Sequence, residues 1–191
     1  MSDWVPRPPG PIVPVPAAAE ADLRGRRVLV GLPGLGWRAD LRADSALVQG
    51  SRTFVPVLTE QEWYRAEAEQ TEVFAPLVPI ERVWVETVGP VPRGEATPVG
   101  RDVFSRLVSL DAPPRREPVP ARDVVGITGR RVVRVGPDGT QRDLRAVTEV
   151  YENAEGDVCV RVCAEVDWYR WGWRGQLPRT LEVPMYQLWA E

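Results

Sequence analysis

Two pairs of acidic residues are the first in this sequence whose types and spacing could carry chemistry. Glu60 and Glu62 form one pair, and Glu165 with Asp167 forms the other. As residues i and i+2 of a strand, each pair would share one face about 7 Å apart, a spacing that suits acid–base chemistry or metal binding. Neighbouring arginines, however, would keep both carboxylates ionised. We therefore expect no catalytic residue, and an enzyme with a carboxylate pair ranks third among the functional hypotheses.

The basic residues narrow the possible chemistry further. The chain contains no His, and because it also lacks Lys, all 24 basic residues are Arg. Without His there is no Ser–His or Cys–His pair and no imidazole metal ligand. Without Lys there is no Schiff base and no phosphate-loop lysine. We expect neither a cofactor nor a metal. The loss of Lys, with Asn153 as the single Asn, indicates a high-GC bacterium.

Two further motifs have simple structural interpretations. Cys159 and Cys163 lie four residues apart in a predicted strand, about 13 Å, which is too far for a disulfide. Free thiols favour a reducing compartment. The glycine-rich residues 31–36 follow a predicted strand as a phosphate loop would, but they lack the G-K-[ST] ending. We predict a hairpin loop there, followed by Trp37 in the next strand.

Charge and hydropathy argue against nucleic acid and membrane as partners. The net charge is −3, whereas a protein that binds nucleic acid without sequence preference usually carries a strong basic excess. The N-terminus has neither the charged start nor the unbroken apolar run of a signal peptide. No apolar stretch approaches the roughly 20 residues of a spanning helix. We expect a cytoplasmic protein.

An internal repeat organises the chain. Residues 59–86 align with 164–191 without a gap, and eight of these 28 positions are identical, including two Trp pairs. The motifs G-R-R-V and D-L-R-A also occur twice upstream. We therefore expect a first copy at 20–86 and a second at 124–191, termed copy one and copy two.

The segments outside the copies have their own composition. Residues 1–19 are rich in proline, which predicts an extended arm. The alternative is an arm docked on the body or on a partner through Ile12, Val13 and Val15. The linker 87–123 offers an apolar stripe at helical spacing only near 101–110. A short helix between the copies is predicted there, with a partner-binding helix as the alternative.

Each copy is predicted to be β. In copy two a turn of composition Gly-Pro-Asp-Gly separates two strands, and residues 158–168 alternate between apolar and polar residues as a half-buried strand does. We extend this strand through residue 173. In the repeated D-L-R-A strand, Leu41 and Ala43 face inward, and so do Leu144 and Ala146.

The order of these motifs resembles small SH3-like barrels of the Tudor and KOW kind. The shared features are a first strand after Gly, a Gly-bearing turn, a D-L-R-A strand, a V-x-V strand and a V-P motif before a last strand. The resemblance implies two tandem five-stranded barrels used for binding, and it covers both copies. It carries over no ligand, because a methyl-lysine cage and basic loops are both missing. The alternative is one continuous sheet or a pseudo-symmetric sandwich formed by both copies.

Residues that only one copy carries are the better functional candidates. Copy two has Tyr169, Trp171 and Trp173 at every second position, where copy one has Tyr64, Ala66 and Ala68. A strand would place the three rings on one outer face, and Arg170 and Arg174 adjoin them in the sequence. Such an apolar patch is seldom left exposed, and its composition is typical of binding hot spots. We expect a protein partner to bind there, with Trp37 of copy one as a further candidate. The alternative is that another part of the chain covers the patch.

These residues lead to a ranked set of functions. The first is a non-enzymatic protein-binding module, either an adaptor or an inhibitor, including an immunity protein that plugs a toxin. The second is a nucleic-acid or ribosome-associated module, in which the aromatic rings would stack on bases.

Overall fold

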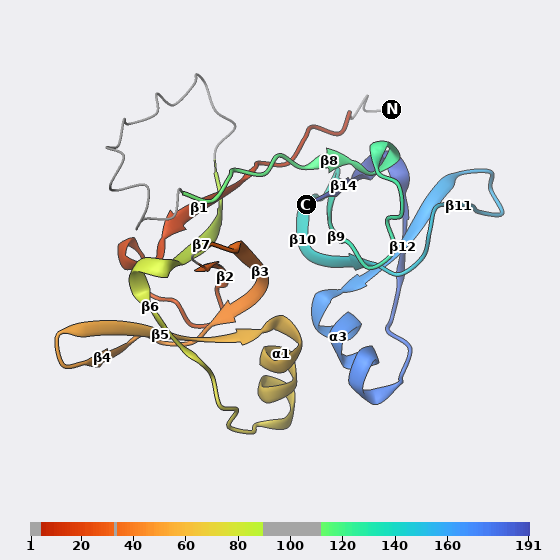
Figure 1. Ribbon diagram of the computed structural model, residues 1–191. Coiled ribbons are helices and arrows are strands. Elements are labelled where there is room, and N and C mark those ends of the chain that lie inside the picture. The colour runs from red at the N-terminus through yellow and green to blue at the C-terminus, as the bar shows by residue number, and fades with distance from the viewer. Residues whose placement is uncertain (1–4, 33, 90–111) are drawn as a thin grey trace, which may run out of the picture. The chain divides into compact units, whose positions relative to one another are not determined.

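The computed structural model describes residues 5–32, 34–89 and 112–191 (Figure 1). These residues are mainly β and form two seven-stranded antiparallel sheets, each with one α-helix. The expected fold of two duplicated β units is therefore confirmed. The helix expected near 101–110 lies outside the described residues.

The elements of copy one run, in chain order, β1 (Ile12–Pro16), η1 (Ala17–Ala19), β2 (Arg27–Leu32), β3 (Gly36–Ala43), β4 (Leu47–Gln49), β5 (Arg52–Thr59), α1 (Glu60–Glu69), β6 (Leu77–Pro79), η2 (Ile80–Arg82) and β7 (Val83–Val88). Those of copy two are β8 (Val119–Pro120), η3 (Ala121–Asp123), β9 (Arg131–Gly136), β10 (Gly139–Ala146), β11 (Tyr151–Glu152), β12 (Val158–Ala164), α3 (Glu165–Arg174), β13 (Leu181–Pro184), η4 (Met185–Gln187) and β14 (Leu188–Ala190). Every η element is a single 3₁₀ turn.

The two sheets have the same strand order. In copy one the order is β1-β7-β2-β3-β5-β4, with β6 paired to β5, and in copy two it is β8-β14-β9-β10-β12-β11, with β13 paired to β12. Strand β6 pairs with β5, and the chain then turns through η2 into β7, which pairs with β2. A single short segment joins the two sides of the sheet, so each sheet curls around its own core.

The V-P motif before the last strand explains this change of partner. In both copies a Pro with extended backbone precedes the 3₁₀ turn, at Pro79 and at Pro184. Because Pro donates no backbone hydrogen bond, it suits the end of a strand, where pairing stops and the chain changes direction.

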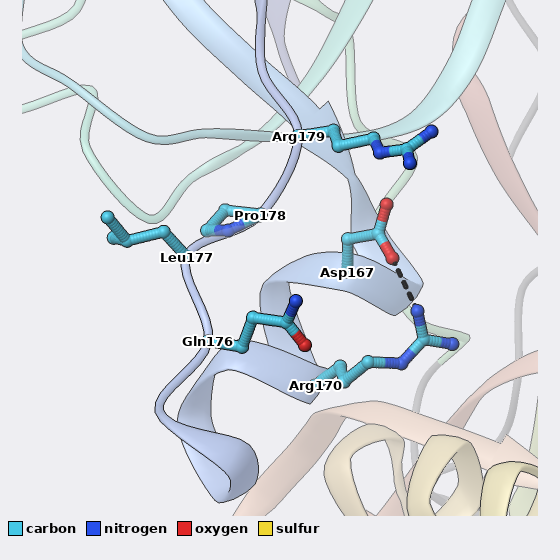
Figure 2. A pocket seen from close by; sticks show the side chains of 6 residues that line it. All are labelled: Asp167, Arg170, Gln176, Leu177, Pro178 and Arg179. Atoms are coloured by element: carbon cyan, nitrogen blue, oxygen red, sulfur yellow. Dashed lines mark hydrogen bonds and ion pairs between the residues drawn. The ribbon is translucent and has the colours of Figure 1, made fainter.

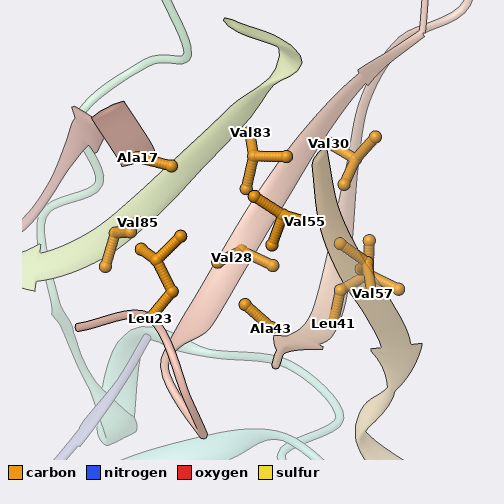
Figure 3. Close-up of a cluster of buried hydrophobic side chains, with 10 residues drawn as sticks. All are labelled: Ala17, Leu23, Val28, Val30, Leu41, Ala43, Val55, Val57, Val83 and Val85. Carbon is orange, nitrogen blue, oxygen red and sulfur yellow. The ribbon is translucent and has the colours of Figure 1, made fainter. Parts of the chain in front are cut away.

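The core of each copy comes from the inward side of its sheet. In copy one ten buried side chains, mostly Val, form the cluster drawn in Figure 3. Leu41 and Ala43 belong to it, and Leu144 with Ala146 takes the matching place in copy two. The inward direction predicted for the D-L-R-A strand is therefore confirmed.

The structure adds one strand to the start of each copy. Strands β1 and β8 precede residues 20 and 124, where the sequence comparison began, and each pairs with the last strand of its own sheet. Val15-Pro16-Ala17 and Val119-Pro120-Ala121 occupy corresponding places, because each Pro precedes a 3₁₀ turn with a fully buried Ala. Part of the proline-rich arm is thus a strand of copy one, whereas residues 5–11 have no regular secondary structure.

Residues 5–11 belong to the unit that contains copy two. Contacts divide the chain into one unit made of these residues with 116–191, and another made of the described residues of Ile12–Arg115. Within the first unit, Arg142 Nη2 donates a hydrogen bond of 2.7 Å to the carbonyl oxygen of Gly10. The copy-two unit is therefore assembled from two separate stretches of sequence.

Candidate functional site

The predicted acidic pairs and aromatic residues lie on helices, where the sequence predicted strand. Figure 1 shows α1 directly after β5 and α3 directly after β12. The prediction that the strand of copy two continues through residue 173 is therefore wrong, because β12 ends at Ala164. Two acidic residues in the first turn of α3 and Arg174 in its last turn complement the helix dipole, and the left-handed Gly175 ends it.

The sequence of copy one contains a motif that predicts these helices. Thr59 caps α1 by accepting a hydrogen bond from the backbone of Glu62, and the Glu62 side chain accepts one from the backbone of Thr59. This T-x-x-E capping box precedes a stretch rich in Ala and Glu, both strong helix formers. Because the alignment has no gap here, the helix of copy one implied a helix in copy two.

Glu165 does not belong to a catalytic pair but lies in a buried ion cluster. It is 1% exposed, and its Oε1 lies 3.2 Å from Nε of Arg131 and 3.0 Å from Nε of Arg145. Arg145 also donates to the carbonyl oxygen of Gly129 at 3.0 Å and to the hydroxyl of Tyr169 at 2.7 Å. This cluster ties α3 to two strands of its sheet.

Copy one repeats the cluster. Glu60 is likewise 1% exposed and lies 3.5 Å from Nε of both Arg27 and Arg42. Arg42 donates to the carbonyl oxygen of Gly25 at 2.8 Å and to the hydroxyl of Tyr64 at 2.7 Å. A network present in both copies belongs to the shared fold.

The expectation that the two carboxylates of each acidic pair share one face is wrong, because these residues lie on helices and not on strands. At about 100° per helical residue, side chains two apart point about 200° apart. Glu165 points into the sheet, whereas Asp167 pairs with Arg170 at 2.9 Å near the surface. Within 5–32, 34–89 and 112–191, no three or more His, Cys, Asp or Glu side chains gather as a metal site would require.

The shared Trp of each helix packs on the shared Gly. Gly25 and Gly129 have φ of +73° and +78°, a region that favours glycine. A Cβ added to either would lie 3.4 or 3.5 Å from Cζ2 of Trp63 or Trp168. Trp63 is buried, whereas Trp168 is half-buried.

The copy-specific aromatics flank the outer side of α3. Trp171 and Trp173 are half-buried, and the Trp171 ring meets the Trp168 ring edge to face at 5.5 Å. The indole nitrogen of Trp173 is buried and has no hydrogen-bond partner among the described residues. By helical geometry Arg170 and Arg174 lie on the arc between the two indoles. The predicted single face of alternating rings is thus replaced by a helical arc with an indole at each edge, and Tyr169 lies instead in the buried ion cluster.

A hollow of about 340 Å³ lies beside this arc. Figure 2 shows Asp167 and Arg170 on α3 facing the segment from Gln176 to Arg179. Leu177 is 74% exposed. Arg174 and Arg179 are also exposed, so the rim is basic in a chain of net negative charge.

Trp37 lies in copy one, in the hairpin of β2 and β3. Gly31 pairs with Trp37 across this hairpin, which confirms the hairpin predicted for residues 31–36. Trp37 is half-buried, and its ring meets that of Trp84 edge to face at 6.1 Å. Trp37 belongs to the other unit, and its role in binding stays a prediction.

The two cysteines are free and buried. Burial raises the pKa of Cys159, and it raises the pKa of Cys163 to about 11, with a smaller contribution from the charge of Asp167. Because the thiolate is the reactive form, neither side chain has the properties of a nucleophile at neutral pH.

None of the helices described is long and apolar enough to cross a membrane. The likeness to SH3-like barrels rests on the order of motifs and strands, and it stays a prediction. Comparison of the chain with models of protein families, with curated proteins and with solved structures found no match.

Proposed function

We propose that this protein is a non-enzymatic, cytoplasmic binding module, an adaptor or an inhibitor of the immunity type, that binds a protein partner through copy two. The binding surface is the outer arc of α3 with the adjacent exposed leucine. This α3 surface comprises Arg170, Trp171, Trp173, Arg174 and Leu177.

One observation carries the proposal. Where copy two has Trp171 and Trp173, copy one has Ala66 and Ala68, in a helix of the same length after the corresponding strand. The shared fold therefore does not require the two indoles. Large rings kept half-exposed at positions that tolerate Ala are better explained by binding than by packing.

The composition of the α3 surface indicates the chemistry of the partner. Arg170, Arg174 and Arg179 outnumber the single carboxylate of Asp167, so an acidic surface complements it. If binding removes about 50 Å² of each partly exposed indole from water, the two rings together contribute about 2.5 kcal/mol before association costs. Trp and Arg are enriched in the hot spots of interfaces, and the α3 surface carries two of each.

The double substitution Trp171→Ala and Trp173→Ala, which installs the residues of copy one, tests the proposal. Tagged full-length wild type and variant are used to capture partners under native conditions, with nuclease treatment and in low and high salt. We expect the wild type to capture a stoichiometric protein partner, and this capture should persist after nuclease treatment and in high salt. The double variant should lose the capture, and Arg174→Glu should weaken it. Phe74→Ala is the control, because Phe74 is an aromatic 93% exposed in copy one.

Two outcomes would contradict the proposal. If the double variant loses its thermal unfolding transition, the indoles belong to the core. If capture depends on nucleic acid and disappears with salt, the surface binds phosphate and bases instead.

A further inference from the structure

Copy one has a hollow of about 520 Å³ beside α1, and Trp63 contributes to its lining. The residues of its lining that matter here are Arg24, Asp44, Trp63, Ala66, Glu67 and Glu72. Its volume is in the range of ligand-binding pockets. Copy one thus carries a hollow beside the Trp that both copies share.

Copy two shows what fits at this position. Ala66 corresponds to Trp171, because α1 and α3 have the same length and begin at corresponding glutamates. The Trp171 ring meets the shared Trp168 edge to face at 5.5 Å, with an interplanar angle of 84°. The same helix position is therefore left open by Ala66 beside Trp63, whose ring Arg24 covers, and is filled by an indole beside Trp168.

We propose that the hollow of copy one binds an indole side chain of a peptide or protein, in the place that Trp171 takes in copy two. The ligand carries basic residues beside its Trp, because Asp44, Glu67 and Glu72 line the hollow together with Arg24 as the single cation. The choice of an indole follows from copy two, and the choice of basic neighbours follows from the acidic residues of the lining. This site lies in the other copy from the α3 surface and does not depend on it.

Arg24 determines how the ring enters. Its guanidinium lies 5.6 Å from the centroid of the Trp63 ring and pairs with Glu67 at 2.7 Å and with Asp44 at 3.4 Å. The Arg24 side chain is 55% exposed, so it can move without leaving a buried charge. Copy two has Thr128 at the matching position, which leaves room for Trp171. An incoming indole therefore displaces Arg24 from Trp63.

The test compares peptides and variants of the full chain. Binding of acetyl-Arg-Trp-Arg-amide is followed by NMR through the indole N–H signals of the protein, with Arg-Ala-Arg and Glu-Trp-Glu peptides as controls. We expect saturable binding of the first peptide and at least tenfold weaker binding of both controls. Ala66→Trp, which copies copy two, should weaken binding at least tenfold. Arg24→Thr should tighten it several-fold.

The two variants keep the test decisive. Ala66→Trp alone could weaken binding by disturbing α1, but Arg24→Thr changes an exposed residue and should act in the opposite direction. Equal binding of the Trp and Ala peptides would show that the hollow recognises only the charge of the peptide, and would overturn the proposal. So would the absence of saturable binding, or unchanged binding by Ala66→Trp. The double variant at Trp171 and Trp173 should keep the copy-one site, which separates this result from the fate of the α3 surface.

Discussion

Glu165→Gln should destabilise copy two strongly, although the side chain keeps its size and shape. In the wild type its carboxylate is almost fully buried and is the shared counter-charge of Arg131 and Arg145, at 3.2 and 3.0 Å. The amide oxygen can still accept hydrogen bonds from both arginines, but the side chain carries no negative charge. Two guanidinium groups are then left beside a neutral group in a buried site.

The magnitude follows from the cost of breaking a buried ion pair. Removing one partner of such a pair costs about 3–5 kcal/mol, because the remaining charge stays desolvated. At about 1.4 kcal/mol for each factor of ten, this cost corresponds to an equilibrium shift of about 100- to 5,000-fold. Asp167→Asn is the matched control. It lies in the same helix turn, but its pair with Arg170 is partly exposed, and such pairs contribute about 0–1 kcal/mol.

Hydrogen exchange measured by mass spectrometry reads the two copies separately, which a single unfolding curve of a two-unit chain does not. In Glu165→Gln the slowest amides of β9 and β10 should exchange about 100-fold faster or more, while those of β2 and β3 keep their wild-type rates. Glu60→Gln should give the reverse pattern. If Glu165→Gln accelerates exchange less than tenfold, as Asp167→Asn should, the cluster does not hold the helix to the sheet and the reasoning fails.

Three further predictions concern backbone, caps and thiols. Gly25→Ala should cost about 1–2 kcal/mol because φ is +73°. Gly172→Ala, in mid-helix with no atom within 4 Å of an added Cβ, should stabilise by about 0.5–1 kcal/mol. Thr59→Ala should lose about 0.5–2 kcal/mol with its capping box, and Ala164→Thr, at a non-helical N-cap without a side-chain bond, should gain a part of that. Hydrogen exchange of the strands of each copy measures all four changes. The raised pKa of Cys163, about 11, predicts slow reaction with a disulfide reagent at pH 8. It also predicts stability that is full below about pH 8.5 and falls toward pH 11, because the unfolded thiol loses its proton first.

The sequence was sufficient for the duplication and the β class because both depend on local patterns. The Trp pairs at a constant offset and the repeated G-R-R-V and D-L-R-A motifs are visible without coordinates, and so is the alternation that marks β12. The helix of copy two was missed because alternation continues from Val158 to Trp168, so a period of two extends past the true end of the strand. In copy one the capping box of Thr59 and Glu62 marks where the strand ends and the helix begins.

The buried ion clusters show a different limit of sequence reasoning. Glu60 and Glu165 looked like exposed strand residues, because the arginines that bind them come from two other strands whose register no local pattern reveals. The sequence did contain one indication of these clusters, because the glutamates are identical in both copies. Their partners Arg42 and Arg145 are identical too, and a charge kept in both copies of a diverged repeat belongs to the fold that they share. The surface over Trp63, in contrast, became visible only when both copies were compared residue by residue.

The composite make-up of the copy-two unit has a consequence for how the chain folds during synthesis. All the described strands of copy one lie between residues 12 and 88, so this copy is complete while the ribosome is still adding the rest. Residues 5–11 leave the ribosome before copy one, yet Gly10 accepts its hydrogen bond from Arg142, 132 residues later. Such distant contacts close late and raise the contact order. Residues 5–11 are therefore made before copy one but are among the last of the described residues to reach their place, and copy one folds ahead of the unit that they complete.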